Sequence, residues 1–295
     1  MQTVRRFLEM IRFSHTLFAL PFAMFSAILA WYRSNSFSWW EVVGILLCMV
    51  FARSAAMAFN RLADRDIDAR NPRTAVRHLP SGLLSVGQVW MFTLACCAGF
   101  IASTAIFLIV DNPWPIYLSM PVLLFLLAYS YTKRFTALAH FWLGASLLLA
   151  PVAAWIAIRG FDEIYLAIII GLAVFFWVAG FDIIYACQDA DFDRQAKLHS
   201  IPAWLGVPTA LRLAYASHVL MIVTLVVLFI FASPPLGWGF RIGLGSVVAL
   251  LTYEHYLVRP DDLSRVNQAF FHVNVIISIG LLLVLLVDIA LDQWL

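Results

Sequence analysis

Long apolar runs alternate with short polar segments along the whole chain. Each run holds about 20 residues, which is enough for an α-helix to cross the hydrocarbon core of a bilayer. The pattern predicts nine transmembrane helices, at about 16–32, 39–59, 86–110, 114–131, 138–158, 163–186, 209–232, 236–257 and 269–290. We therefore expect an all-α polytopic membrane protein with a single transmembrane domain over residues 1–295.

Composition supports a membrane protein and excludes several other classes. Of the 295 residues, 63% are hydrophobic and only 12% are charged, whereas soluble domains carry about 25% charged residues. Nine spans leave no room for a large extramembrane domain. The four cysteines lie in or at the ends of apolar runs without CxxC spacing, so neither a zinc site nor a disulfide framework is expected. Nucleic acid is not an expected partner.

Basic residues gather on one side of the membrane when the loops are assigned to alternate faces. The loops of one face carry only Arg33, Arg159 and Arg241, and Arg53 falls inside a span. The opposite face holds Arg5, Arg6, Arg12, Arg61, Arg65, Arg70, Arg73, Arg77, Lys133, Arg134, Arg194, Lys197, Arg212, Arg259 and Arg265. The positive-inside rule makes this second face cytoplasmic, and a bacterial inner membrane is expected. The N-terminus would then be cytoplasmic and, with an odd number of spans, the C-terminus would be outside.

Aspartates cluster on the same face as the basic residues. Two stretches, DRDID at 64–68 and DADFD at 189–193, share one spacing, and each follows an even-numbered span. A repeated motif at this interval suggests two four-helix pseudo-repeats, over about 16–131 and 138–257, followed by a ninth helix.

The aspartate spacing favours a metal site. If each helix continues past the membrane surface, Asp64 and Asp68 lie at i and i+4 on one helix face, as do Asp189 and Asp193. Paired carboxylates repel one another unless a cation lies between them. Hard oxygen ligands favour Mg²⁺, which commonly joins protein carboxylates to a substrate phosphate. The two motifs therefore predict Mg²⁺ and a phosphorylated ligand.

Basic side chains near the two motifs suit a diphosphate. Arg73 and Arg77 follow the first motif, and Lys133 with Arg134 closes the fourth span. Arginine can contact phosphate oxygens in a bidentate manner. A diphosphate on an allylic carbon is a leaving group whose departure metal ions assist, and the resulting carbocation needs a dry, apolar chamber. Aromatic rings such as Phe25 or Trp177 could face that cation, although packing is the simpler explanation for them.

These motifs resemble the UbiA superfamily of intramembrane aromatic prenyltransferases. The resemblance rests on NRLADRDIDARNPRT at 60–74, YSYTKRFT at 129–136 and DIIYACQDADFD at 182–193. It implies a ring of transmembrane helices around a central cavity, with the two Asp motifs facing each other below a cytoplasmic cap. It implies that Mg²⁺ and its diphosphate are held by Asn60, Asp64, Asp68, Asp189 and Asp193. It also implies that the prenyl diphosphate or the acceptor is bound by Arg12, Arg73, Arg77, Tyr129, Lys133, Tyr185 and Ser200.

The resemblance leaves the acceptor site more open. Arg134 is a candidate to pair with an aromatic carboxylate, and either Asp182 or Asp189 could remove a proton from the acceptor. Two positions depart from the family pattern. Arg61 stands where many relatives have an acid, which removes one possible metal ligand, and Lys197 stands where relatives often have glycine.

The expected reaction transfers a polyprenyl group from polyprenyl diphosphate to 4-hydroxybenzoate or a benzoate-like ring. The segment LHSIP at 198–202 resembles a 4-hydroxybenzoate polyprenyltransferase-like branch, some members of which serve the futalosine route to menaquinone, so a menaquinone precursor is the alternative acceptor. A CDP-alcohol phosphotransferase would show one compact Asp-rich motif with glycine. A cation or proton transporter would place its acids in mid-bilayer. Membrane lipid is an expected partner, and protein partners are not predicted.

Overall fold

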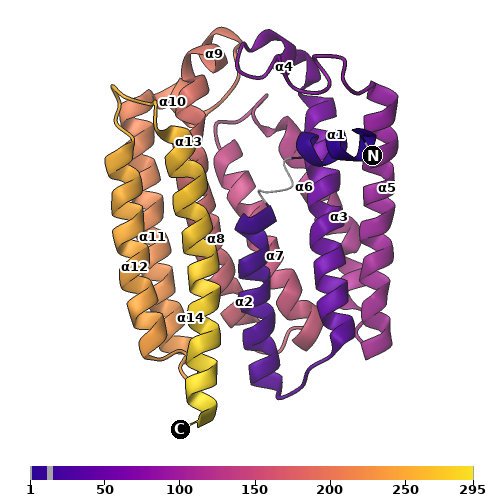
Figure 1. The fold of residues 1–295 in the computed structure, drawn as a ribbon, viewed down its shortest axis with the longest axis vertical. Coiled ribbons are helices and arrows are strands. Elements are labelled where there is room, and N and C mark those ends of the chain that lie inside the picture. Colours follow the sequence, from indigo (N-terminus) through magenta and orange to yellow (C-terminus); the bar gives the residue numbers. More distant parts are fainter. Residues whose placement is uncertain (1, 12–15, 295) are drawn as a thin grey trace. The chain divides into compact units, whose positions relative to one another are not determined.

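The computed structural model describes residues 2–11 and 16–294, and helices make up most of this part of the chain (Figure 1). The elements that contribute to the account below are α1 (Gln2–Met10), α2 (Thr16–Ser34), α3 (Trp39–Ala63), α4 (Arg65–Arg70), α5 (Val86–Thr104), η2 (Ala105–Val110), α6 (Trp114–Thr132), α7 (Ala139–Arg159), α8 (Ile164–Ala186), η3 (Cys187–Asp189), α9 (Ala190–Gln195), α10 (Ile201–Leu205), α11 (Val207–Ala232), α12 (Trp238–Leu257), α13 (Val266–Gln268), η4 (Ala269–Val273) and α14 (Asn274–Trp294). The all-α class is confirmed.

Each of the nine expected spans coincides with a long helix, and most boundaries agree within a few residues. By length and hydropathy, seven helical segments of the described chain are able to cross a membrane. The first and eighth expected spans, α2 and α12, are helical but are not among these seven. In α12 the polar residues Arg241, Glu254 and His255 lower the mean hydropathy. The count of nine membrane crossings and the orientation of the termini stay predictions.

The helices form two compact units. Unit 1 comprises residues 1–16 and 36–132, and unit 2 comprises residues 17–35 and 133–295. The boundary after Thr132 lies between the two expected pseudo-repeats. The second helix, α2, belongs to unit 2, although the pseudo-repeat pattern groups it with the first half of the chain.

Unit 1 is built around α3, which packs against α5, η2 and α6. Gly44 of α3 lies directly against the ring of Phe107 in η2. A larger residue would not fit there, because a Cβ atom at this position would come within 2.6 Å of that ring. At the other end of α3, the amphipathic helix α1 presents Met10 to a small core that includes Leu62 and Val89. The α5 helix begins with a capping box formed by Ser85 and Gln88.

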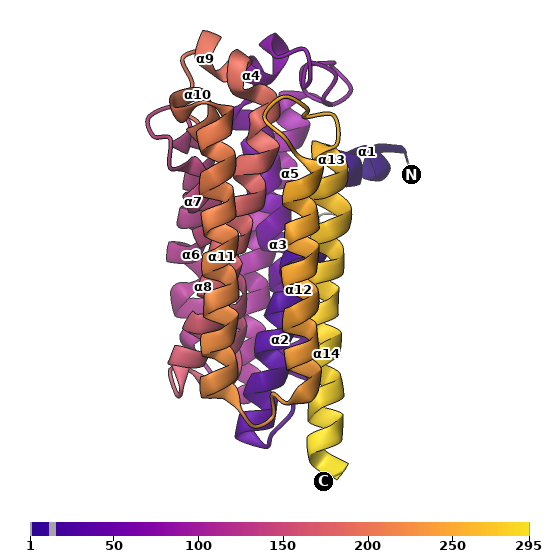
Figure 2. The ribbon, with the colours of Figure 1, turned by 90° about the vertical axis from the view of Figure 1, so that its left-hand side faces the viewer.

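Unit 2 is centred on α8, whose residues are largely buried between α7 and α11. The helices α11 and α12 pack against each other, and α12 also packs against α14 (Figure 2). Gly180 in α8 allows the ring of His218 in α11 to lie directly against the helix, since a Cβ atom there would be 2.3 Å from the imidazole. Trp177 and Phe25 belong to the buried core of this unit, so packing accounts for both rings.

Candidate active site

Both aspartate motifs lie where a long helix breaks into a short one. α3 ends at Ala63 and α4 begins at Arg65, and between them Asp64 has φ −94° and ψ 2°. α8 ends at Ala186, and Asp189 at the end of η3 has φ −105° and ψ 4° before α9 begins. These angles lie in the sparsely populated bridge region rather than in the α region. The α-helical conformation is therefore interrupted within each motif, at Asp64 and at Asp189. Aspartate is a poor helix former because its carboxylate competes for backbone groups, which favours a break at this position.

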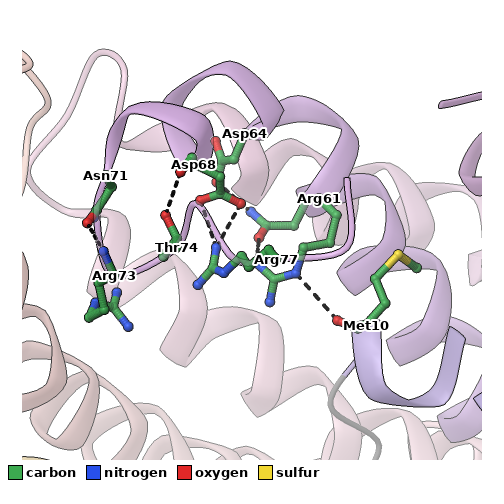
Figure 3. A network of polar contacts seen from close by, with 9 residues as sticks. Met10, Arg61, Asp64, Asp68, Asn71, Arg73, Thr74 and Arg77 are labelled. Atoms are coloured by element: carbon green, nitrogen blue, oxygen red, sulfur yellow. Dashed lines mark hydrogen bonds and ion pairs between the residues drawn. The ribbon is translucent and has the colours of Figure 1, made fainter. Parts of the chain in front are cut away.

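The first motif buries its two outer aspartates. Asp64 and Asp68 are 2% and 3% exposed. Asn60 Nδ2 donates a hydrogen bond of 3.1 Å to Asp64 Oδ2. Arg77 Nη1 donates to both carboxylate oxygens of Asp68, at 2.8 and 2.9 Å (Figure 3). Asp68 thus has a countercharge from its own chain. Asp68 was expected to bind the metal and Arg77 the phosphate, but in this structure the two side chains bind each other.

A tight turn after α4 brings Arg77 back to Asp68. The backbone N–H of Arg73 donates to Asn71 Oδ1 at 2.9 Å, and the Thr74 hydroxyl donates to the carbonyl of Asp68 at 3.1 Å (Figure 3). Arg73 itself is half-buried. The turn therefore positions both arginines beside the first motif.

Arg61 forms hydrogen bonds with neighbouring groups of the protein. Its Nη1 donates to Asn60 Oδ1 at 3.4 Å, and its Nε donates to the carbonyl of Met10 at 3.4 Å. The bond to Asn60 orients its amide. The bond to Met10 holds the end of α1 (Figure 3). Arg61 thus fixes the side chain of its neighbour Asn60.

Arg53 is a residue of unit 1 to which the sequence assigned no role. It lies in α3 seven residues before Asn60, about two helical turns and roughly 10 Å along the axis, so both project from nearly the same face. Its Nε is buried and has no hydrogen-bond partner among the described residues. An arginine inside an apolar span favours a functional role. Tyr129, also in unit 1, is half-buried near the end of α6.

The second motif lies beside the loop that joins α9 to α10. Asp193 is half-buried, accepts a hydrogen bond from the Ser200 hydroxyl, and feels the charges of Asp189 and Lys133. The loop is tied to the basic pair, because the His199 N–H donates to the carbonyl of Lys133 at 2.8 Å. The fold of unit 2 therefore brings together Asp189, Asp193, Lys133 and Ser200.

Three further residues of unit 2 differ in their surroundings. Tyr185 is half-buried and Arg134 is exposed. Lys197, just after α9, has φ +55°. This left-handed conformation is one that glycine adopts without strain.

The middle aspartates of the two motifs face solvent. The side chains of Asp66 and Asp191 are 83% and 87% exposed, and each pairs with a nearby arginine, Arg65 or Arg194. Side chains this exposed are poorly placed to bind a metal ion. The family resemblance likewise does not include Asp66 or Asp191 among the metal ligands.

Asp182 has a partner that the sequence did not reveal. His140 Nδ1 lies 2.7 Å from Asp182 Oδ2. The two residues are 42 positions apart, and no spacing in a single sequence indicates such a pair. Arg12, an expected diphosphate contact, lies outside the described residues.

The donor set suits Mg²⁺ shared with a phosphate better than a cage made by protein alone. In the described ranges, no group of three His, Cys, Asp or Glu side chains is placed to hold a metal ion. The outer aspartates offer hard oxygen donors on each motif, and buried carboxylates such as Asp64 favour a nearby cation. Mg²⁺ commonly takes one or two carboxylates and completes its coordination with water and phosphate oxygens. The residues present therefore fit this metal.

The fold and the paired aspartate motifs define an intramembrane enzyme class, and comparison with known proteins gives the family. Residues 19–276 match the UbiA prenyltransferase family. The chain therefore belongs to the UbiA prenyltransferase family, and it is an integral membrane prenyltransferase.

Named relatives and solved structures support this assignment along most of the chain. The chain is 28% identical to a 4-hydroxybenzoate octaprenyltransferase of Saccharophagus degradans over 85% of its length and 83% of the relative. It is 30% identical to one of Nitrosomonas eutropha over 82% of its length and 83% of that protein. An apo UbiA homolog from Aeropyrum pernix has a TM-score of 0.80 at 32% identity and covers 95% of this chain and 98% of its own. A UbiA homolog from Archaeoglobus fulgidus bound to GPP and Mg²⁺ shares the fold, with a TM-score of 0.65 at 22% identity over 95% of this chain and 99% of its own.

Proposed function

We propose that the protein transfers a polyprenyl group from polyprenyl diphosphate to an aromatic lipoquinone precursor, with 4-hydroxybenzoate as the acceptor. The observation that carries this proposal is the repeated helix break, which places an aspartate at the end of α3 and another at the end of α8. The curated relatives named 4-hydroxybenzoate octaprenyltransferase support the acceptor. The family assignment argues against the phosphotransferase and transporter alternatives.

Each motif is proposed to take part in diphosphate binding. Mg²⁺ would supply positive charge to the leaving diphosphate oxygens. Asp64 and Asn60 in unit 1 would supply oxygen ligands for Mg²⁺, and Asp189 and Asp193 in unit 2 would do the same. A bound diphosphate can compete with Asp68 for Arg77, since guanidinium pairs well with either anion. Arg73 and Lys133 would contact the remaining phosphate oxygens. A homolog of the same fold that was solved with GPP and Mg²⁺ supports a prenyl diphosphate and Mg²⁺ as ligands.

The acceptor carboxylate has two candidate partners. Arg134 is exposed, whereas Arg53 has a buried Nε inside α3 and lies on the face of that helix that carries Asn60. A charge-assisted hydrogen bond is stronger in a dry site than at an exposed surface. We therefore favour Arg53 as the carboxylate ligand over Arg134.

The acceptor assignment predicts a specific kinetic pattern. Arg53→Ala should raise the KM for 4-hydroxybenzoate by about tenfold to a hundredfold, which corresponds to roughly 1.5–3 kcal/mol for one lost charged hydrogen bond. The KM for the prenyl diphosphate should stay close to the wild-type value. Arg134→Ala is the matched comparison. If Arg134→Ala alone raises the acceptor KM, Arg134 is the carboxylate ligand.

Product analysis tests the function itself. The purified protein in detergent is incubated with Mg²⁺, a polyprenyl diphosphate and a panel of aromatic acids, and the products are identified by mass spectrometry. Prenylated 4-hydroxybenzoate, lost with EDTA and restored with Mg²⁺, is the expected result. Prenylation of only a futalosine-type precursor would support the menaquinone alternative. Absence of any prenylated aromatic product would overturn the proposal.

A further inference from the structure

A histidine and an aspartate in unit 2 form a buried pair close to the second aspartate motif. His140 is in the first turn of α7, and Asp182 is near the end of α8. The His140 Nδ1 to Asp182 Oδ2 distance is 2.7 Å, and the two side chains are 6% and 18% exposed. This distance lies at the short end of the range for N–H···O hydrogen bonds, and the burial of His140 excludes water from most of the pair.

The backbone fixes which nitrogen of His140 carries the proton. The N–H of Ile201 points at His140 Nε2, with a donor–acceptor distance of 3.4 Å. A nitrogen that receives an N–H must act as an acceptor, so the proton of the neutral imidazole is on Nδ1. Nδ1 therefore donates to Asp182 Oδ2.

This arrangement leaves one oxygen of Asp182 available. Because His140 binds Oδ2, Oδ1 is the oxygen to which no described residue donates a hydrogen bond, and Asp182 remains partly accessible. The same loop that supplies the Ile201 N–H also supplies Ser200, which donates to Asp193. His140 thus links the Asp182 carboxylate to the loop that holds the second motif.

We propose that His140 is a positioning residue that orients Asp182, and that Asp182 Oδ1 takes the hydroxyl proton of a phenolic acceptor. The inference rests on the proposed function and selects Asp182 over Asp189 as the base. Removal of the hydroxyl proton raises the electron density of the ring carbon that attacks the prenyl group.

The proton and electron balance of the step is simple. The phenol O–H breaks and its proton goes to Asp182 Oδ1. The allylic C–O bond breaks and its electron pair leaves with the diphosphate, while the ring carbon bonds to the allylic carbon and forms a dienone. The ring then loses the hydrogen from that carbon and regains the hydroxyl proton from Asp182. One proton and one diphosphate are released for each prenyl group transferred.

Two substitutions of His140 separate orientation of Asp182 from simple packing. His140→Asn keeps an N–H donor near the position of Nδ1, whereas His140→Leu keeps bulk and removes the donor. His140→Leu should lower kcat with 4-hydroxybenzoate by about a hundredfold, the range of a general base contribution, without raising the KM for geranyl diphosphate. His140→Asn should recover at least about a tenth of the wild-type kcat, because one donor hydrogen bond is retained. His272→Ala, at an exposed histidine of η4, is the matched control.

Acceptor acidity supplies a readout that a purely structural role would not change. 3-Fluoro-4-hydroxybenzoate has a more acidic phenol and still has a free ring carbon beside the hydroxyl. If Asp182 takes the phenol proton, the ratio of rates with the fluorinated and unfluorinated acceptors should be at least about fivefold higher in His140→Leu and in Asp182→Asn than in the wild type, since a more acidic phenol depends less on the base. An unchanged ratio in both variants would overturn the proposal.

The controls distinguish this inference from the proposed function. If the wild type prenylates no phenolic acid, the proposed function fails first. If the wild type is active and His140→Leu keeps its kcat, the inference about His140 fails alone. Magnesium-dependent binding of geranyl diphosphate and the melting temperature report whether His140→Leu is folded. If that variant does not fold, the acidity ratio of Asp182→Asn and the recovery in His140→Asn decide the question.

Discussion

The two aspartate motifs share a backbone but not an environment. In both, the first aspartate lies at a break between a long helix and a six-residue helix, with nearly equal φ and ψ. Asp68 of the first motif is buried and paired with Arg77, whereas Asp193 of the second is half-buried beside Ser200 and Lys133. The comparison teaches that the repeated sequence determines the position of the carboxylates, while the loops that follow determine which cations and donors surround them.

The largest effect is expected from the first aspartate of each motif. Asp64→Asn and Asp189→Asn should each reduce turnover by about a thousandfold, because loss of metal assistance costs several kcal/mol of transition-state stabilisation. Turnover is measured with a radiolabelled prenyl diphosphate. Asp66→Asn and Asp191→Asn are matched controls, since both side chains are exposed, and should keep near wild-type rates. Equal losses of turnover in the control and test variants would contradict the distinction between the first and the middle aspartate of each motif.

A second prediction concerns the ion pair between Arg77 and Asp68 in the first motif. Arg77→Ala leaves the buried Asp68 carboxylate without this guanidinium, and should lower the free energy of unfolding by about 3 kcal/mol. Thermal unfolding in detergent measures this loss. The double variant Arg77→Ala with Asp68→Asn should recover most of the stability but not the affinity for prenyl diphosphate. If the double variant recovers both, Arg77 serves only to neutralise Asp68.

A third prediction contrasts the residues four positions before each first aspartate. Asn60 donates to Asp64 Oδ2, and Tyr185 occupies the corresponding place before Asp189. Asn60→Ala should reduce turnover by about tenfold, the effect of one lost hydrogen bond to a charged group. Tyr185→Phe should have a smaller effect if only its ring is needed. A greater loss in Tyr185→Phe, measured in the same assay, would show that the hydroxyl is required.

The smallest effect is expected where the short helices end. α4 ends in extended backbone at Asn71, whereas Lys197 after α9 has φ +55°. Lys197→Gly should raise the free energy of unfolding by about 1 kcal/mol, because glycine relieves the left-handed strain. The melting temperature reports this change, and Lys133 remains to serve the phosphate. A decrease in stability would show that the Lys197 side chain makes stabilising contacts that outweigh the strain.

The sequence alone predicts the helices well because each apolar run must be long enough for a membrane. All nine runs coincide with helices. The helix breaks at Asp64 and Asp189 were not predicted, since periodicity extends a helix unless glycine or proline interrupts it. The Arg77–Asp68 and His140–Asp182 pairs depend on turns and helix packing that hydrophobic patterning does not encode. Motif resemblance supplied the aspartates, whereas a buried arginine such as Arg53 needed a structure to show its surroundings.

Binding of geranyl diphosphate, measured by isothermal titration calorimetry, tests most directly whether each motif is required for diphosphate binding. The wild type should bind it only with Mg²⁺. Asp64→Asn and Asp189→Asn should each abolish this binding, and the double variant should be no weaker than either single variant, because residues that act as one unit are not additive. Magnesium-dependent binding with wild-type affinity in either single variant would contradict the account.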